Sequence, residues 1–250
     1  MRFVETVMGI PMSIDIRDEQ DAAPAAERAF QVLKAADRRF SSYRPDSELS
    51  RANAAGGTAA EYSADFREVV AIGEAAGRDS GGAFRIRLDD GTWDLDGVVK
   101  GWAAARAARE LAASGVRNFC LNAGGDVVAA GSPGGERPWN VGIRSPHAPS
   151  DMMAVLAVSD VGVATSGLYE RGAHIVDGRD GSTPRSLLSV TVVADDLTTA
   201  DVLATAVFGL GREGIDWALT AGARGVLAMD ASNRLLRAGD LAFARPEHAA

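Results

Sequence analysis

The chain of 250 residues contains a single cysteine, Cys120, so no disulfide bond can form within it. Cys120 lies in an apolar stretch with no base beside it in sequence, which favours a small buried side chain over a nucleophile. The sequence also lacks an apolar run long enough to cross a membrane, and residues 1–16 alternate like a strand rather than a signal peptide. We therefore expect a soluble, cytoplasmic chain.

Positive charge is scarce as well. Lys and Arg number 26 against 34 Asp and Glu, the formal net charge is −8 at pH 7, and no long basic run occurs. Because nucleic-acid binding needs a broad positive surface, we expect no nucleic-acid partner. A negatively charged ligand would need local help from a cation or a metal ion.

Short alternating apolar stretches are interspersed with stretches of helical periodicity, for example at residues 21–40, and hairpin signals such as D-D-G at 89–91 separate some of them. This pattern indicates the α+β class, with mixed sheets and packed helices. The length and the 46% content of hydrophobic residues predict one large domain over residues 1–250, or two closely packed lobes.

Residues 94–126 combine two glycine-containing segments with one lysine. Residues 94–101, D-L-D-G-V-V-K-G, predict a short strand and a glycine turn that carries Lys100, followed by an alanine-rich helix from about Trp102 to Ala113. A buried strand at 116–121 leads to a second turn, N-A-G-G-D, at 122–126. Glycines let backbone N–H groups approach an anion, which suggests a phosphate-bearing ligand; glycines that merely end helices and strands are the alternative.

Asp201 and Thr205 stand four residues apart in a helix predicted to open at Thr198 and to run through Leu210. That spacing places both side chains on one helix face, and a carboxylate with a hydroxyl suits Mg²⁺. The alternative is structural: Asp201 complements the helix dipole, and Thr205 bonds back to the preceding turn.

Further candidates stand outside that helix. His174, in an expected strand, could accept a proton from a hydroxyl nucleophile, or simply bond a backbone carbonyl. Ser166, followed by Gly167 at a strand end, could present a hydroxyl to a ligand, but the G-x-S-x-G elbow of a hydrolase is absent. Tyr43 and Trp102 could stack on a planar ring or belong to the core.

Six motifs follow one another along the chain: F-S-S-Y-R-P-D-S-E-L-S (40–50), D-L-D-G-V-V-K-G-W-A (94–103), N-A-G-G-D (122–126), A-T-S-G-L-Y-E-R (164–171), H-I-V-D-G-R-D-G (174–181) and A-D-V-L-A-T-A-V-F (200–208). In this order they resemble the ApbE family, the FAD:protein FMN transferases. The resemblance begins at M-G-I-P-M (8–12) and implies a T-fold-related architecture with a ligand cleft between two lobes.

The resemblance also implies a reaction. Such enzymes bind FAD with Mg²⁺, cleave its pyrophosphate, transfer FMN to a Thr or Ser hydroxyl of an acceptor protein and release AMP. Two alternatives stay open: hydrolysis of FAD to FMN and AMP, and flavin binding without catalysis.

By motif match, Asp201 and Thr205 would hold Mg²⁺, with the backbone carbonyl of Ala123 as a further ligand. Lys100 and His174 would act in catalysis, the first as a positive charge and the second as a base near the reacting phosphate. The residues expected to contact FAD are Met8, Tyr43, Lys100, Ser166, Gly167 and His174.

Three positions depart from the family pattern. An F-D-P-T-like run is F-R-I-R at 84–87, an aspartate that often follows K-G-[YW]-A is Ala105, and a D-P-R-T-G segment is D-G-R-D-G at 177–181. The first two touch the region that the resemblance assigns to FAD.

Overall fold

The computed structural model describes residues 1–19, 21–148, 150–167 and 176–244. Its centre is an eight-stranded sheet in the order β1-β2-β3-β4-β7-β8-β9-β10. The strands are β1 (Arg2–Val7), β2 (Ile10–Ile16), β3 (Phe119–Ala123), β4 (Asp126–Ala130), β7 (Val161–Gly167), β8 (Leu187–Ala194), β9 (Ala223–Asp230) and β10 (Leu235–Gly239). Neighbouring strands in this described sheet all pair antiparallel.

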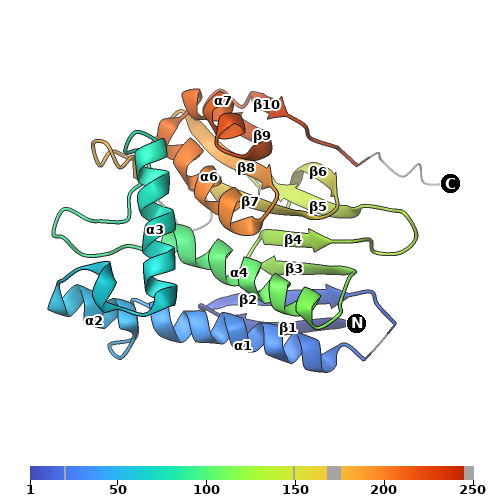
Figure 1. Ribbon diagram of the computed structural model, residues 1–250. Coiled ribbons are helices and arrows are strands. Elements are labelled where there is room, and N and C mark those ends of the chain that lie inside the picture. Colours follow the sequence, from blue (N-terminus) through green and yellow to red (C-terminus); the bar gives the residue numbers. More distant parts are fainter. Residues whose placement is uncertain (20, 149, 168–175, 245–250) are drawn as a thin grey trace.

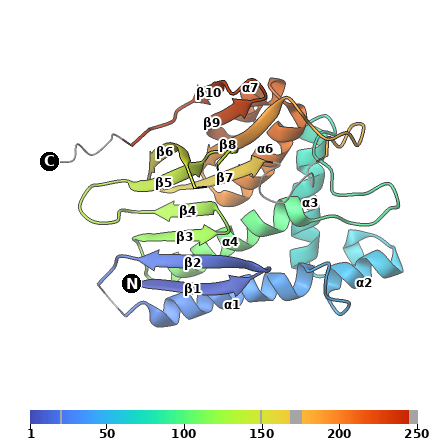
Figure 2. The same cartoon turned by 180° about the vertical axis from the view of Figure 1, so that it is seen from behind.

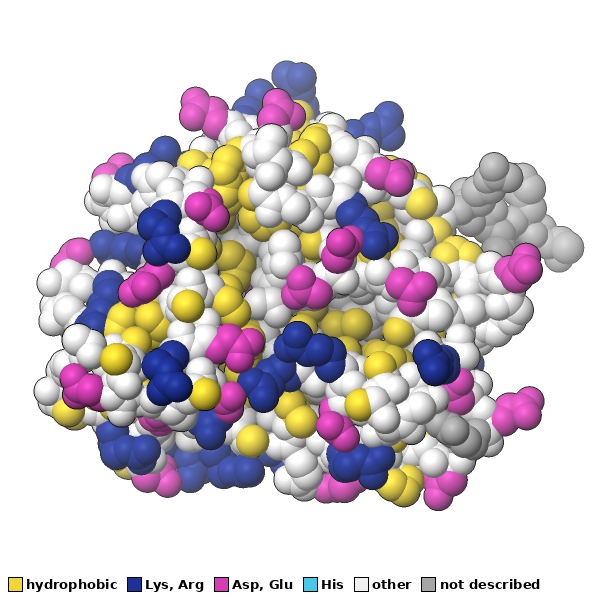
Figure 3. Space-filling view, viewed as in Figure 1, with side chains coloured by type: hydrophobic (Ala, Val, Ile, Leu, Met, Phe, Trp, Pro, Cys, Tyr) yellow, Lys and Arg dark blue, Asp and Glu magenta, His cyan; other side chains and the backbone are white. Residues whose placement is uncertain are grey.

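The main helices gather on one face of the sheet (Figure 1). The helical segments are α1 (Ala23–Phe40), α2 (Glu48–Ala55), η1 (Ala59–Glu61), α3 (Ala64–Asp79), α4 (Asp96–Ala113), α6 (Leu197–Leu210) and α7 (Glu213–Thr220). The hairpin of β5 (Trp139–Arg144) and β6 (Met152–Val158) packs on the other face (Figure 2). On the helix-covered face, basic and acidic side chains are interspersed (Figure 3), in keeping with the absence of a basic run.

Strand alternation divides the core into two clusters. In β4, Val128 packs towards the helices, whereas Val127 and Ala129 face the β5–β6 hairpin. On the helical side, α4 lies between α1 and α6 and contacts both. Ala104 and Ala107 of α4 are fully buried, and their small side chains let neighbouring helices approach closely.

An aromatic cluster joins α1, α3 and α4. The ring of Phe66 stacks on Phe40 at a centroid distance of 6.1 Å and lies 4.9 Å from Tyr62 and 6.1 Å from Trp93. Trp102 packs edge-on to Phe40 at 5.6 Å and is 3% exposed. Trp102 is therefore a core residue and not one that stacks on a ligand ring.

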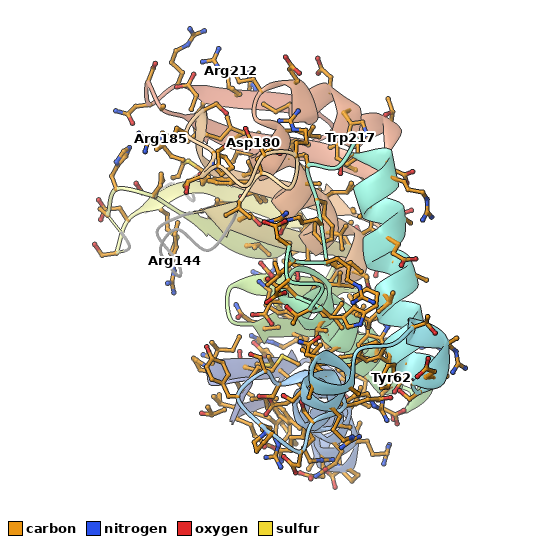
Figure 4. All side chains as sticks on the ribbon, turned by 90° about the vertical axis from the view of Figure 1, so that its left-hand side faces the viewer. Tyr62, Arg144, Asp180, Arg185, Arg212 and Trp217 are labelled. Atoms are coloured by element: carbon orange, nitrogen blue, oxygen red, sulfur yellow. The ribbon has the colours of Figure 1, made fainter. Side chains whose placement is uncertain are left out.

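Helix α3 runs across the helical layer and contacts α4 and α6. Ser63 caps its first turn by accepting a hydrogen bond from the N–H of Phe66. At its other end, Trp217 Nε1 of α7 donates to the carbonyl of Asp79 at 3.0 Å. Tyr62 and Trp217 mark these two ends in Figure 4.

The α+β class is confirmed, but several local predictions are wrong. Lys100 and Gly101 are not in a turn; they lie within α4, which begins at Asp96. The N–H of Asp96 donates to Asp94 Oδ1 at 3.1 Å. Residues 94–95 form no strand.

The start of α6 also differs from the prediction. The helix begins at Leu197, and Asp196 caps it by accepting hydrogen bonds from the N–H groups of Thr198 and Thr199. The capping residue therefore stands two positions before Thr198.

Cys120 lies on β3, and burial raises the pKa of its thiol to about 11. The thiol stays protonated at neutral pH, as expected for a cysteine that is not a nucleophile. Within the ranges that the structure describes, no helix combines the length and apolar character needed to span a bilayer.

Phe66→Ala should lower the free energy of unfolding by roughly 3–5 kcal/mol, because it leaves a cavity inside the aromatic cluster. Urea unfolding measures this loss. Phe243→Ala, at a ring that is 38% exposed, is the control and should cost less than about 1 kcal/mol. Equal losses in the two variants would contradict this account of the core.

Candidate functional site

Two adjoining depressions lie beside the first turns of α4, and Asp96 and Lys100 line both of them. The first, about 160 Å³, we call the Thr205 cavity; the second, about 370 Å³, we call the Tyr43 depression. Sites for ligands of drug size usually measure about 300–1,000 Å³. The Thr205 cavity is too small to hold a ligand as large as a dinucleotide by itself, and Lys100 lines both depressions.

Asp201 and Thr205 both line the Thr205 cavity from one face of α6, as their spacing predicts. Asp201 is only 3% exposed. The Oγ of Ser166, at the end of β7, lies 3.1 Å from the Oγ1 of Thr205, and Gly167 completes this wall. The sheet and α6 thus bring two hydroxyls and a carboxylate to one cavity.

Gly101 sets the distance between α4 and α6. Its N–H donates to Asp201 Oδ2 at 2.9 Å. A Cβ atom at this position would lie 2.7 Å from Asp201 Cβ and 2.8 Å from the carbonyl oxygen of Leu197. Glycine is required here by close helix packing rather than by a turn.

Lys100 lies between two buried carboxylates. Its Nζ is 2.5 Å from Asp126 Oδ2 and 3.7 Å from Asp201 Oδ1. Asp126 is 2% exposed, and its Oδ1 accepts the N–H of Thr165 at 3.0 Å, so β4 and β7 fix its position. Sequence reasoning assigned no role to Asp126, although it is the last residue of the N-A-G-G-D motif.

The charge balance at this cluster favours a further cation. Burial raises the pKa of Asp201 to about 7. The positive charge of Lys100 lowers this pKa, and the negative charge of Asp126 raises it further. One ammonium group cannot neutralise two ionised carboxylates. A cation bound beside Asp201 would therefore favour its ionised form.

The Tyr43 depression presents different chemistry. Tyr43 is 96% exposed at its edge, free to stack on a planar ring. Met8 reaches it from the tight turn between β1 and β2, where Met8 and Gly9 have φ values of 53° and 72°. An aromatic ring and a thioether suit a large apolar ligand group.

The described residues do not test the predicted roles of two site residues, His174 and Ala123. His174 lies outside the described residues. Ala123 is fully buried at the end of β3, paired with Asp126 across the hairpin, and is not among the described residues lining either depression. A metal ligand role for its carbonyl stays a prediction.

The sequence profile of the ApbE family matches residues 8–92 and 86–228, which together span most of the chain. The chain belongs to the ApbE family. One ApbE relative, the FAD:protein FMN transferase of Rhodobacter capsulatus, is 37% identical over 162 residues, 62% of this chain. Another, the FAD:protein FMN transferase of Haemophilus influenzae, is 25% identical over 274 residues, 82% of this chain and 79% of the relative. The match to the Rhodobacter capsulatus protein, by contrast, covers only 30% of that relative's length.

Solved ApbE structures share the fold. The ApbE protein of Thermotoga maritima superposes with a TM-score of 0.84 at 23% identity, covering 95% of this chain and 96% of that one. The flavin transferase ApbE of Vibrio cholerae gives 0.81 at 21% identity, covering 97% and 96%. Two of the three departures from the ApbE pattern lie in different surroundings: Arg85 lines the Thr205 cavity, whereas Ala105 is buried in α4.

Gly101→Ala should destabilise the fold by roughly 1–3 kcal/mol, because the added methyl group has no room between α4 and α6. Thermal unfolding measures the loss. Ala112→Leu adds a larger group at an exposed position of the same helix and should stay within about 0.5 kcal/mol of the unchanged chain. Full stability of Gly101→Ala would show that the two helices are not held at this distance.

Proposed function

We propose that this chain transfers FMN from FAD to a Thr or Ser hydroxyl of an acceptor protein and releases AMP. The observation that carries the proposal is the buried cluster of Lys100, Asp126 and Asp201, in which Lys100 lines both depressions and Asp201 lines the Thr205 cavity. The relatives named FAD:protein FMN transferase support the same reaction.

The donor set fits Mg²⁺ bound together with substrate. Asp201 and Thr205 offer hard oxygen ligands from adjacent turns of α6, and the described residues contain no cluster of three or more His, Cys, Asp and Glu side chains suited to a metal. Mg²⁺ typically takes one or two protein carboxylates and completes its shell with phosphate oxygens and water. When bound here, Mg²⁺ would neutralise charge on the diphosphate.

Lys100 would act as a fixed positive charge towards the same diphosphate. Asp126 holds its ammonium group in place, so little reorganisation is needed when a ligand binds. Phosphoryl-type transfer depends mostly on such positioning and charge neutralisation. This is how a chain with a net charge of −8 would hold an anionic ligand.

The reaction balances as a displacement at phosphorus. The acceptor hydroxyl oxygen bonds to the FMN phosphorus, the bond from that phosphorus to the bridging oxygen breaks, and the bridging oxygen leaves with AMP. The hydroxyl proton passes to a base, for which His174 is the candidate from the sequence. Tyr43 and Met8 would hold the flavin in the Tyr43 depression. The AMP half would then occupy the Thr205 cavity.

Asp201→Asn should lower the rate of FMN transfer by roughly 10²-fold, because it removes a charged oxygen ligand from the cluster. The assay incubates the purified chain with FAD, Mg²⁺ and an acceptor carrying a D-x-x-[ST]-G-A-T-like segment, and measures acceptor fluorescence and AMP. Asp195→Asn, at a carboxylate that is 80% exposed before α6, is the matched control and should keep the full rate.

Other outcomes discriminate the alternatives. AMP and free FMN without a labelled acceptor would indicate a pyrophosphatase. FAD binding without AMP release would indicate a flavin-binding relative that lacks catalysis. Full transfer by Asp201→Asn would contradict the metal assignment.

A further inference from the structure

Arg85 is a second cation of the Thr205 cavity that no step above uses. Among the described residues that line this cavity, Lys100 and Arg85 are the cations, whereas Asp94, Asp96 and Asp201 are acidic. Three carboxylates repel a phosphate group more than one ammonium attracts it. A phosphate group in this cavity therefore gains from the second positive charge.

The backbone around Arg85 is held from three sides. The Oγ of Ser80, at the end of α3, accepts the N–H of Phe84 at 3.0 Å. The carbonyl of Ala83 accepts the N–H of Gly178 at 2.9 Å, and that of Ile86 accepts the N–H of Asp94 at 3.0 Å. The Cβ of Arg85 consequently has a fixed position at the cavity wall.

The guanidinium group has unused donor capacity. Nη1 donates to Asp89 Oδ1 at 2.8 Å, but the Asp89 side chain is 90% exposed, so water competes with this ion pair. Nε is buried and has no acceptor among the described residues. A buried donor without an acceptor is unfavourable, and the guanidinium group carries five N–H donors, more than the single ion pair with Asp89 uses.

We propose that Arg85 binds the phosphate group of the AMP half of the dinucleotide. This assignment rests on the proposed function, because that function places AMP in the Thr205 cavity. It adds a specificity-determining residue: the cavity would favour a nucleotide over the corresponding nucleoside through a guanidinium contact.

The test is calorimetric binding of AMP and of adenosine to the full chain, with Mg²⁺ present. Arg85→Gln should weaken AMP binding about tenfold and leave adenosine binding unchanged, because only AMP carries the phosphate group. Arg85→Lys should recover part of the loss, since it restores the charge but not the fork. Arg87→Gln is the matched control: Arg87 lies over the Trp93 ring at 3.3 Å and does not line the cavity, so AMP binding should be unchanged.

Asp89→Asn separates ligand binding from a structural role. If Arg85 contacts phosphate, this variant binds AMP at least as tightly as the unchanged chain, because the guanidinium is released from its ion pair. An equal loss in Asp89→Asn and Arg85→Gln would overturn the proposal, since it would show that the ion pair merely supports the hairpin.

Two other results would also overturn it: no AMP binding by the unchanged chain, or an equal loss of AMP and adenosine binding in Arg85→Gln. Binding is measured without turnover. A chain that fails to transfer FMN but shows the AMP-specific loss would therefore contradict the proposed function and leave the role of Arg85 standing.

Discussion

The site depends on the contact between α4 and α6 at Gly101 and Asp201. The absence of a side chain at Gly101 lets its N–H donate to the Asp201 carboxylate, and the same approach places Lys100 beside that carboxylate. Burying an acid is unfavourable unless hydrogen bonds and opposite charge compensate it. Among the residues that the structure describes, the compensation is incomplete, because Asp126 shares the ammonium group of Lys100. The incompletely neutralised cluster is therefore suited to a ligand that arrives with a cation.

An acidic protein can bind an anion only where positive charge is concentrated locally. The net charge of −8 opposes a broad attraction, and charges of both signs are interspersed over the helix-covered face (Figure 3). Lys100, Arg85 and a divalent ion would concentrate positive charge at the Thr205 cavity. The exposed Tyr43 ring lies in the adjoining depression, so the two halves of a dinucleotide would meet different chemistry on either side of Lys100.

The sequence predicted the pairing of Asp201 with Thr205 because their spacing depends only on helix geometry. It misplaced Lys100 and Gly101 because a glycine between apolar residues is compatible with a turn and with close helix packing alike, and only the position of α6 decides between them. Asp126 was missed because its role depends on long-range contacts with Lys100 and Thr165. For the same reason, the sequence could not separate the exposed Tyr43 from the buried Trp102.

The most direct test of the central claim is a crystal structure of the chain with Mn²⁺ and FAD, in which anomalous scattering locates the metal. We predict a manganese peak in contact with the Asp201 carboxylate and the Thr205 hydroxyl, and diphosphate oxygens near Lys100. A peak elsewhere, or a diphosphate bound away from Lys100, would contradict it.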